Sequence, residues 1–151
     1  MKTIIADTSC LIVYDKIGQL EILRQTLPNL IVTKEVEVEF GVLPDWVRIK
    51  ELKDRGDYFK LLRNLGKGEA SSISLALELD NSLLIMDEKK GRKVAQKLRI
   101  ETIGSLGVLM KAKEKKIIKS VGAILNLIDG TDFRLSRAIR EEILKESGEL
   151  K

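Results

Sequence analysis

The sequence predicts an α/β fold in which a parallel sheet carries helices on both of its faces. Short apolar runs of strand length alternate along the chain with segments of helical periodicity, and turn residues separate the two. Two of the apolar runs end directly at an acidic residue, Asp7 and Asp87. Strands that alternate with helices form parallel sheets, because each helix returns the chain to the edge where the previous strand began. The 151 residues suffice for one hydrophobic core, so we expect a single domain over residues 1–151.

The first third of the chain contains two predicted strands separated by two predicted helices. The side chains of Asp7, Thr8 and Ser9 can cap the helix that follows the first strand. Pro28 and Asn29 mark the turn into the second strand. The predicted elements are a strand at 2–6, helices at 10–17 and 20–27, and a strand at 30–33.

The segment from Lys34 to Phe40 fits two structures. Its apolar residues alternate as in a strand, but Thr33 is also a suitable N-cap for a helix whose first turn would hold Glu35 and Glu37. The local pattern leaves both open. The residues that follow are irregular as far as 57, with a short strand predicted at 46–50, and a helix is predicted at 58–64.

The second half of the chain has a clearer periodicity. Apolar residues at helical spacing follow a turn at 65–68 and place Glu69 in the first turn of a helix. A later apolar strand ends at Asp87 and Glu88, and a basic helix follows it. The predicted helices are 69–79, 89–98, 104–114, 121–128 and 135–146, and the predicted strands are 83–86 and 100–103. Together with the first half, this gives a sheet of four to five strands.

The composition excludes several kinds of site. The chain has no histidine and a single cysteine, Cys10, which excludes histidine bases, histidine-ligated zinc and an internal disulfide. We therefore expect a reducing, cytoplasmic location, and no apolar run reaches the roughly 20 residues of a membrane helix. The net charge of +4 favours polyanionic partners such as nucleic acid. The turn at 66–68 lacks the spacing of a phosphate-binding loop, so we expect no nucleotide cofactor.

Acidic residues occur at the positions where an α/β fold places its site. Asp7 and Asp87 would lie at the carboxyl edge of the sheet, which is the functional edge of open α/β folds. Glu69 begins the helix before the Asp87 strand and is available as a third carboxylate. Glu39 or Glu35 would add a fourth, since a helix would place both on one face. Each acid alone could be an ordinary cap or turn residue, but their repeated position at strand ends favours a common site.

Clustered carboxylates indicate a metal ion. They repel one another and raise each other's pKa values unless a cation neutralises them. Oxygen ligands without histidine select Mg²⁺ or Mn²⁺ rather than zinc or copper. Such ions activate water and stabilise the oxygens that exchange at a phosphodiester. The sequence therefore predicts metal-dependent phosphodiester hydrolysis.

Four stretches of the chain together resemble the PIN-domain family, in its small single-domain prokaryotic form that includes the toxin ribonucleases of toxin–antitoxin pairs. They are Ile4-Ile5-Ala6-Asp7-Thr8-Ser9, Gly66-Lys67-Gly68-Glu69-Ala70-Ser71-Ser72-Ile73, Leu84-Ile85-Met86-Asp87-Glu88 with Gly91-Arg92, and Gly104-Ser105-Leu106-Gly107-Val108-Leu109. The resemblance covers nearly the whole chain. Residues 83–92 resemble one uncharacterised branch of the family more closely than they resemble the well-known toxins.

The resemblance implies a three-layer α/β/α sandwich and a quartet of acids that binds Mg²⁺ or Mn²⁺ and hydrolyses single-stranded RNA. It places the quartet at Asp7, Glu39, Glu69 and Asp87, with Glu69 where many members have Asp, and it favours a helix for 34–40. It also implies that Thr8 or Ser9 lies near the metal and that Glu88 and Ser105 support the acids.

The same resemblance implies partners. Family members commonly form homodimers, and toxin members are inhibited by an antitoxin protein whose segment enters the acidic site. Lys89, Lys90 and Arg92 follow Asp87 directly and are candidates for binding RNA phosphates. The alternative function is a catalytically silent module of the same fold that binds RNA or a partner protein.

Overall fold

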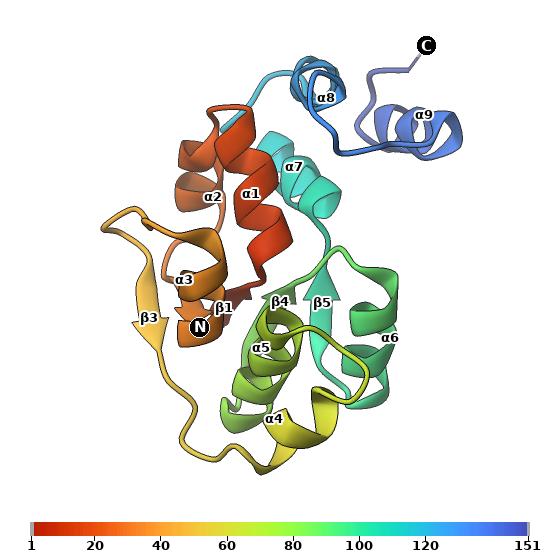
Figure 1. The fold of residues 1–151 in the computed structure, drawn as a ribbon. Coiled ribbons are helices and arrows are strands. Elements are labelled where there is room, and N and C mark those ends of the chain that lie inside the picture. The colour runs from red at the N-terminus through yellow and green to blue at the C-terminus, as the bar shows by residue number, and fades with distance from the viewer. Residues whose placement is uncertain (1, 151) are drawn as a thin grey trace.

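The computed structural model describes residues 2–150 and confirms an α/β fold with one parallel sheet. The strands are β1 (Thr3–Ala6), β2 (Leu30–Thr33), β3 (Arg48–Lys50), β4 (Ser82–Ile85) and β5 (Glu101–Ile103). They lie in the order β3-β2-β1-β4-β5 (Figure 1). The helices are α1 (Thr8–Lys16), α2 (Leu20–Thr26), α3 (Lys34–Phe40), α4 (Gly56–Leu61), α5 (Lys67–Glu78), α6 (Lys89–Lys97), α7 (Ser105–Glu114), α8 (Val121–Asp129) and α9 (Arg137–Glu146).

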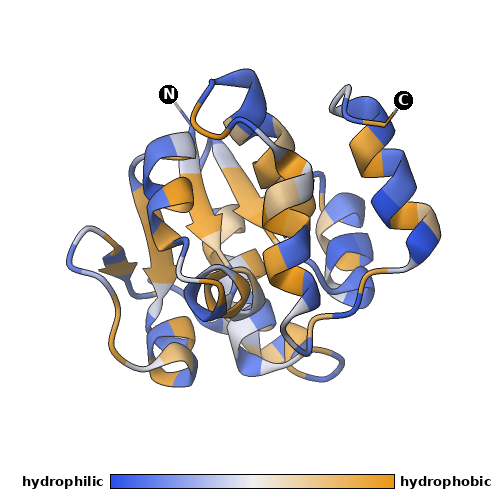
Figure 2. Ribbon diagram, turned by 90° about the horizontal axis from the view of Figure 1, so that it is seen from above, coloured by the Kyte–Doolittle hydropathy of each residue, from blue (hydrophilic) through white to orange (hydrophobic). Residues whose placement is uncertain are grey.

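The sheet separates two hydrophobic cores, as a three-layer sandwich requires. Successive side chains of a strand point to opposite faces. Ile4 and Ala6 of β1 accordingly pack in one core with helices α1, α2, α7 and α8, whereas Ile5 packs in the other core with α4, α5 and α6. Figure 2 shows the apolar residues on the strands and on the helix faces that cover them. Because both faces are covered, the strands are apolar along their whole length rather than alternating.

The segment 34–40 is a helix, as the family resemblance favours. The Thr33 hydroxyl caps it by accepting a hydrogen bond from the Val36 N–H at 3.1 Å. Val36 is buried in the core, whereas Val38 is 74% exposed. The apolar residues Val36, Val38 and Phe40 alternate as in a strand, but only Val36 is fully buried. Their alternation therefore does not indicate a strand.

Three local expectations need correction. The strand predicted at 46–50 begins only at Arg48, and the helix predicted at 58–64 is α4, which begins at Gly56 and ends at Leu61. The first helix begins at Thr8, with Asp7 in the N-cap position, but the Asp7 side chain does not cap it. This carboxylate is buried at the edge of the sheet instead. Within residues 2–150, no helix is long and apolar enough to cross a membrane.

Candidate active site

Asp7 and Asp87 come directly after neighbouring strands of the sheet. Strands β1 and β4 are paired with Ala6 opposite Ile85, and the Asp7 N–H donates to the Ile85 carbonyl at 3.0 Å. The order of strands reverses between β1 and β4, so the connections leave in opposite directions from this point (Figure 1). Open α/β sheets bind ligands in the crevice that such a reversal creates. The two acids therefore lie where the topology opens the sheet edge.

The carboxylate of Asp87 is fixed by the start of α7. The Ser105 N–H donates to Asp87 Oδ1 at 2.7 Å, and the Ser105 hydroxyl donates to the other oxygen. Ser105 is only 1% exposed, and its carbonyl accepts a hydrogen bond from the buried Tyr14 hydroxyl at 2.9 Å. A helix N-terminus favours a negative charge beside it. Both oxygens of Asp87 therefore have a defined position.

The structure separates the two candidates for the second acid. The Thr8 hydroxyl donates to Glu39 Oε1 at 2.6 Å, which holds Glu39 beside the first turn of α1 and next to Asp7. Glu35, one turn earlier in α3, forms an ion pair of 2.7 Å with Arg55. The structure therefore brings Glu39 to Asp7 and directs Glu35 toward Arg55, just before α4.

Glu69 lies in the first turn of α5. Its Oε1 accepts a hydrogen bond from the Gly66 N–H at 3.3 Å. Its other oxygen, Oε2, is buried and has no hydrogen-bond partner among the described residues. Burial and the neighbouring Glu88 carboxylate raise the pKa of Glu69. A buried carboxylate oxygen without a donor is costly unless a cation or a proton reaches it.

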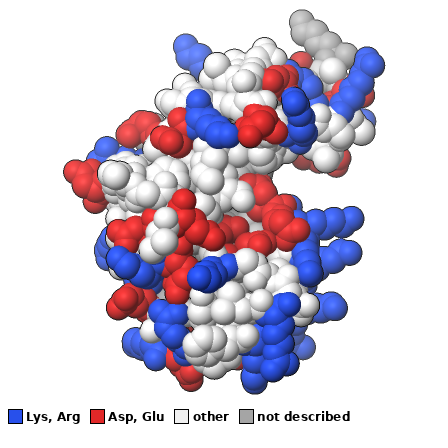
Figure 3. All heavy atoms as spheres, viewed as in Figure 1, with Lys and Arg blue, Asp and Glu red and all other residues white. Residues whose placement is uncertain are grey.

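The electrostatics of Asp7 show that the four acids act on one another. Asp7 is 3% exposed. Burial raises the pKa of Asp7 from 3.8 to about 7, opposed by the Thr8 N–H and reinforced by repulsion from Glu69, Glu39 and Asp87. The elements that carry these residues surround the sheet edge, and acidic side chains line the hollow between them (Figure 3).

This donor set fits a hard divalent cation. All four side chains offer oxygen, the ligand that Mg²⁺ and Mn²⁺ prefer. Within residues 2–150, no three acidic side chains are drawn together tightly enough to hold an ion as they stand. The unpartnered oxygen of Glu69 and the raised pKa of Asp7 are nevertheless the two features that a cation would relieve.

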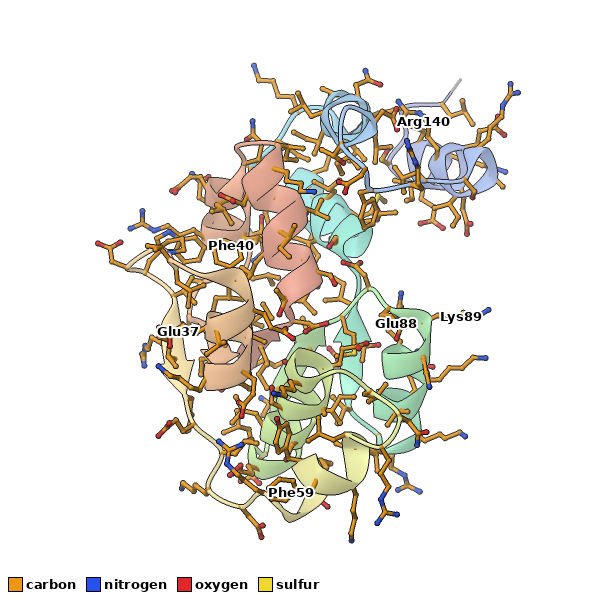
Figure 4. The ribbon with its side chains drawn as sticks, in the orientation of Figure 1. Glu37, Phe40, Phe59, Glu88, Lys89 and Arg140 are labelled. Atoms are coloured by element: carbon orange, nitrogen blue, oxygen red, sulfur yellow. The ribbon has the colours of Figure 1, made fainter. Side chains whose placement is uncertain are left out.

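The other predicted residues are distributed around this cluster. Glu88 caps α6 by accepting the Gly91 N–H at 2.9 Å, and Ser9 is exposed in a hollow that Asp87 also lines. Lys89 points out into solvent (Figure 4), and Lys90 is also exposed. Of the three basic candidates, Arg92 lies nearest to Asp87, because both side chains approach Gly104.

Three glycines in the stretches that carry the family resemblance lie against the acids, a role that sequence reasoning did not assign to them. A Cβ atom added to Gly68 would lie 2.2 Å from Glu39 Oε1, and one added to Gly91 would lie 3.0 Å from Glu69 Oε2. One added to Gly104 would lie 3.1 Å from Asp87 Oδ1. Gly68 falls in the turn predicted at 65–68, so its sequence context is ordinary. Gly91 lies inside the helix predicted at 89–98, where glycine is unfavourable, and this is a signal that the sequence offers.

One comparison identifies a family. A family model described as a PIN domain matches residues 3–149 of the chain. No match was found among curated proteins.

Proposed function

The chain belongs to the PIN-domain family, and from this premise we propose that it is a divalent-metal-dependent endoribonuclease that hydrolyses single-stranded RNA. PIN domains have a nuclease-type fold. The observation that carries the proposal is the gathering of acids at one sheet edge: Asp7 is 3% exposed, Thr8 holds Glu39 beside it, and Ser105 holds Asp87. Burial above all, and then repulsion from the three other acids, raises the pKa of Asp7 to about 7. Such repulsion does not stabilise a fold, which supports a role in holding a cation.

In this proposal Asp7, Glu39, Glu69 and Asp87 hold Mg²⁺ or Mn²⁺. When bound, such an ion makes water a stronger nucleophile and stabilises negative charge on the phosphodiester. The chain itself holds the ligands in place, because Ser105 orients Asp87 and Thr8 orients Glu39. Because Asp7 carries a proton in part near pH 7, we expect metal binding to release protons and to strengthen as the pH rises.

The family likeness extends the proposal to partners. We propose that the chain forms a homodimer in the cytoplasm and acts as the toxin of a toxin–antitoxin pair. A basic segment of an antitoxin would complement the four acids at the sheet edge, which supports inhibition by occupation of that edge.

The proposal is tested by cleavage of a mixed-sequence single-stranded RNA with Mn²⁺, with Mg²⁺ and with EDTA. We expect cleavage only with metal, and a loss of at least about a hundredfold in Asp7→Asn. The matched control is Asp80→Asn, an exposed aspartate just before β4 and thus at the opposite edge of the sheet. Wild-type protein that binds RNA without cutting it, while Asp7→Asn binds RNA more tightly, would instead establish the catalytically silent module.

A further inference from the structure

The segment between α8 and α9, residues 131–135, forms a wall shared by two hollows that both reach Asp87. The first hollow, of about 420 Å³, lies beside α1 and is lined by Ile12, Val13 and Phe133. The second, of about 440 Å³, lies beside α7 and is lined by Arg92, Phe133 and Arg134. Each has the size of a pocket for a small ligand. Figure 3 shows the indentation between the part of the molecule that carries α8 and α9 and the part that carries α6.

Contacts at both ends hold the 131–135 segment in place. Lys16 of α1 donates to Asp132 at 2.6 Å. The Thr131 hydroxyl donates to the Ile128 carbonyl at 2.6 Å and accepts the Phe133 N–H at 3.1 Å. At the far side, Arg140 of α9 pairs with Asp129 at 2.7 Å and points back to α8 (Figure 4). The half-buried Phe133 ring therefore packs in part against the hydrophobic core and lines both hollows.

The two hollows differ in chemistry. Ile12, Val13 and the Phe133 ring give the first hollow an apolar surface, which suits the face of a nucleobase. Polar side chains line the rest of it, among them the carboxylates of Asp87, Glu88 and Asp132. The second holds two guanidinium groups, and neither Arg92 nor Arg134 forms an ion pair with another residue between 2 and 150. Guanidinium groups without an acidic partner are suited to phosphate. Asp87, which lines both hollows, connects them to the acid cluster.

We propose that the 131–135 segment and its two hollows form a nucleotide-binding subsite for single-stranded RNA. A base stacks on Phe133 in the hollow beside α1, and a phosphate of the same strand binds Arg92 and Arg134 in the hollow beside α7. The proposal deepens the proposed function and rests on it, because the subsite places the strand against Asp87. Stacking accepts every base, so we expect weak sequence preference at this position.

The test is RNA binding without metal, so that it does not depend on cleavage. Fluorescence anisotropy of a short, labelled, mixed-sequence RNA in EDTA compares wild type with Phe133→Leu, which keeps an apolar side chain but removes the ring, and with Phe133→Tyr, which keeps an aromatic ring. We expect roughly tenfold weaker binding for Phe133→Leu and near-wild-type binding for Phe133→Tyr. The matched control is Phe59→Leu, since Phe59 is 62% exposed on α4 and distant from both hollows (Figure 4). Thermal melts of all variants verify folding.

A second variant tests the phosphate half of the subsite. Arg134→Ala should weaken the binding of RNA of every sequence. It should also reduce the slope of the logarithm of the affinity against the logarithm of the salt concentration by about one. Arg48→Ala, at the amino end of edge strand β3, is the matched control that should leave both unchanged.

Unchanged RNA affinity in Phe133→Leu, or no RNA binding by wild type, overturns the subsite. The two proposals fail separately. Metal-dependent cleavage in which Phe133 has no role would support the proposed nuclease function and contradict the proposed subsite. RNA binding that depends on Phe133, without any RNA cleavage, would support the proposed subsite and contradict the proposed nuclease function.

Discussion

At the scale of single residues, the acid cluster depends on the absence of side chains beside it. Gly68 and Gly104 each lie against a carboxylate, whereas a Cβ added to Gly91 would meet Met86 Sδ at 2.6 Å before Glu69 Oε2 at 3.0 Å. None of the three has a backbone conformation that requires glycine. Gly68 is the tightest case, because an added Cβ would overlap Glu39 Oε1 and approach the Thr8 hydroxyl within 3.0 Å. These positions therefore require glycine because a neighbouring side chain needs the space, a carboxylate at Gly68 and Gly104 and chiefly Met86 at Gly91. Backbone strain does not explain them.

Gly68→Ala should separate stability from activity. Alanine is favoured over glycine in a helix by about 1 kcal/mol, and the atom it meets is the mobile end of a glutamate. We expect the melting temperature to be retained while Glu39 is displaced from Thr8 and RNA cleavage falls about tenfold or more.

The control for this prediction is Gly56→Ala at the start of α4, whose Cβ would approach Asp54 rather than an acid of the cluster. Cleavage by Gly68→Ala at the wild-type rate would show that Glu39 does not need its present position.

At the scale of elements, the C-terminal end of the described chain stabilises α8. Glu149 accepts hydrogen bonds from the Val121 and Gly122 N–H groups at 2.7 and 2.9 Å, and it pairs with Lys113 of α7 at 2.7 Å. Burial would raise the pKa of Glu149, but these contacts and Ser120 outweigh it and lower the pKa to about 2. One carboxylate thus joins α7, the first turn of α8 and the residues after α9.

Glu149→Gln should destabilise the protein by about 1–2 kcal/mol at neutral pH, because the charged hydrogen bonds are weakened. The folded-state pKa lies below the ordinary 4.5, so the wild-type contribution is present above that value and is lost as the pH falls toward 2. Urea denaturation at neutral and acidic pH measures both effects.

Glu146→Gln on the exposed face of α9 is the matched control for Glu149→Gln. Equal stability of Glu149→Gln and wild type at neutral pH would contradict the role assigned to this carboxylate.

At the scale of the whole molecule, the cluster of acids opposes folding when no cation is bound. The pKa of Asp7 is raised from 3.8 to about 7, so the folded protein binds more protons than the unfolded chain between these pH values. The free energy of unfolding therefore falls as the pH rises through this window. The buried carboxylate of Asp7 therefore lowers the stability of the metal-free protein at the point where the strand order reverses.

Asp7→Asn should therefore stabilise the metal-free protein above pH 7, by at most about 4 kcal/mol, and the difference should shrink as the pH falls toward 4. Thermal denaturation in EDTA at several pH values measures this. With Mn²⁺ added, we expect the wild type to gain more stability than the variant. A wild type that is more stable than Asp7→Asn in EDTA at alkaline pH would refute the assignment.

Much of the architecture could be predicted because it follows from local rules. The apolar runs before Asp7 and Asp87 predict β1 and β4, and parallel strands bring their carboxyl ends to one edge. The helix at 34–40 could not be predicted locally, since its residues fit a strand equally well. The Thr33 cap is visible in the sequence, and the burial of Val36 in the core, with Val38 left exposed, decides in favour of the helix.

The amino-acid sequence was sufficient to predict the α/β fold class and the sheet edge at which Asp7 and Asp87 lie, and the structure confirms both. The oxygen-only metal chemistry stays a prediction. These predictions follow from periodicity, composition and the geometry of parallel strands. Tertiary structure alone decided that Glu39 rather than Glu35 joins Asp7, because the choice depends on Thr8 and Arg55 in distant segments. It also decided that residues 131–135 stand beside Asp87, since such contacts arise only when elements far apart in the chain pack together.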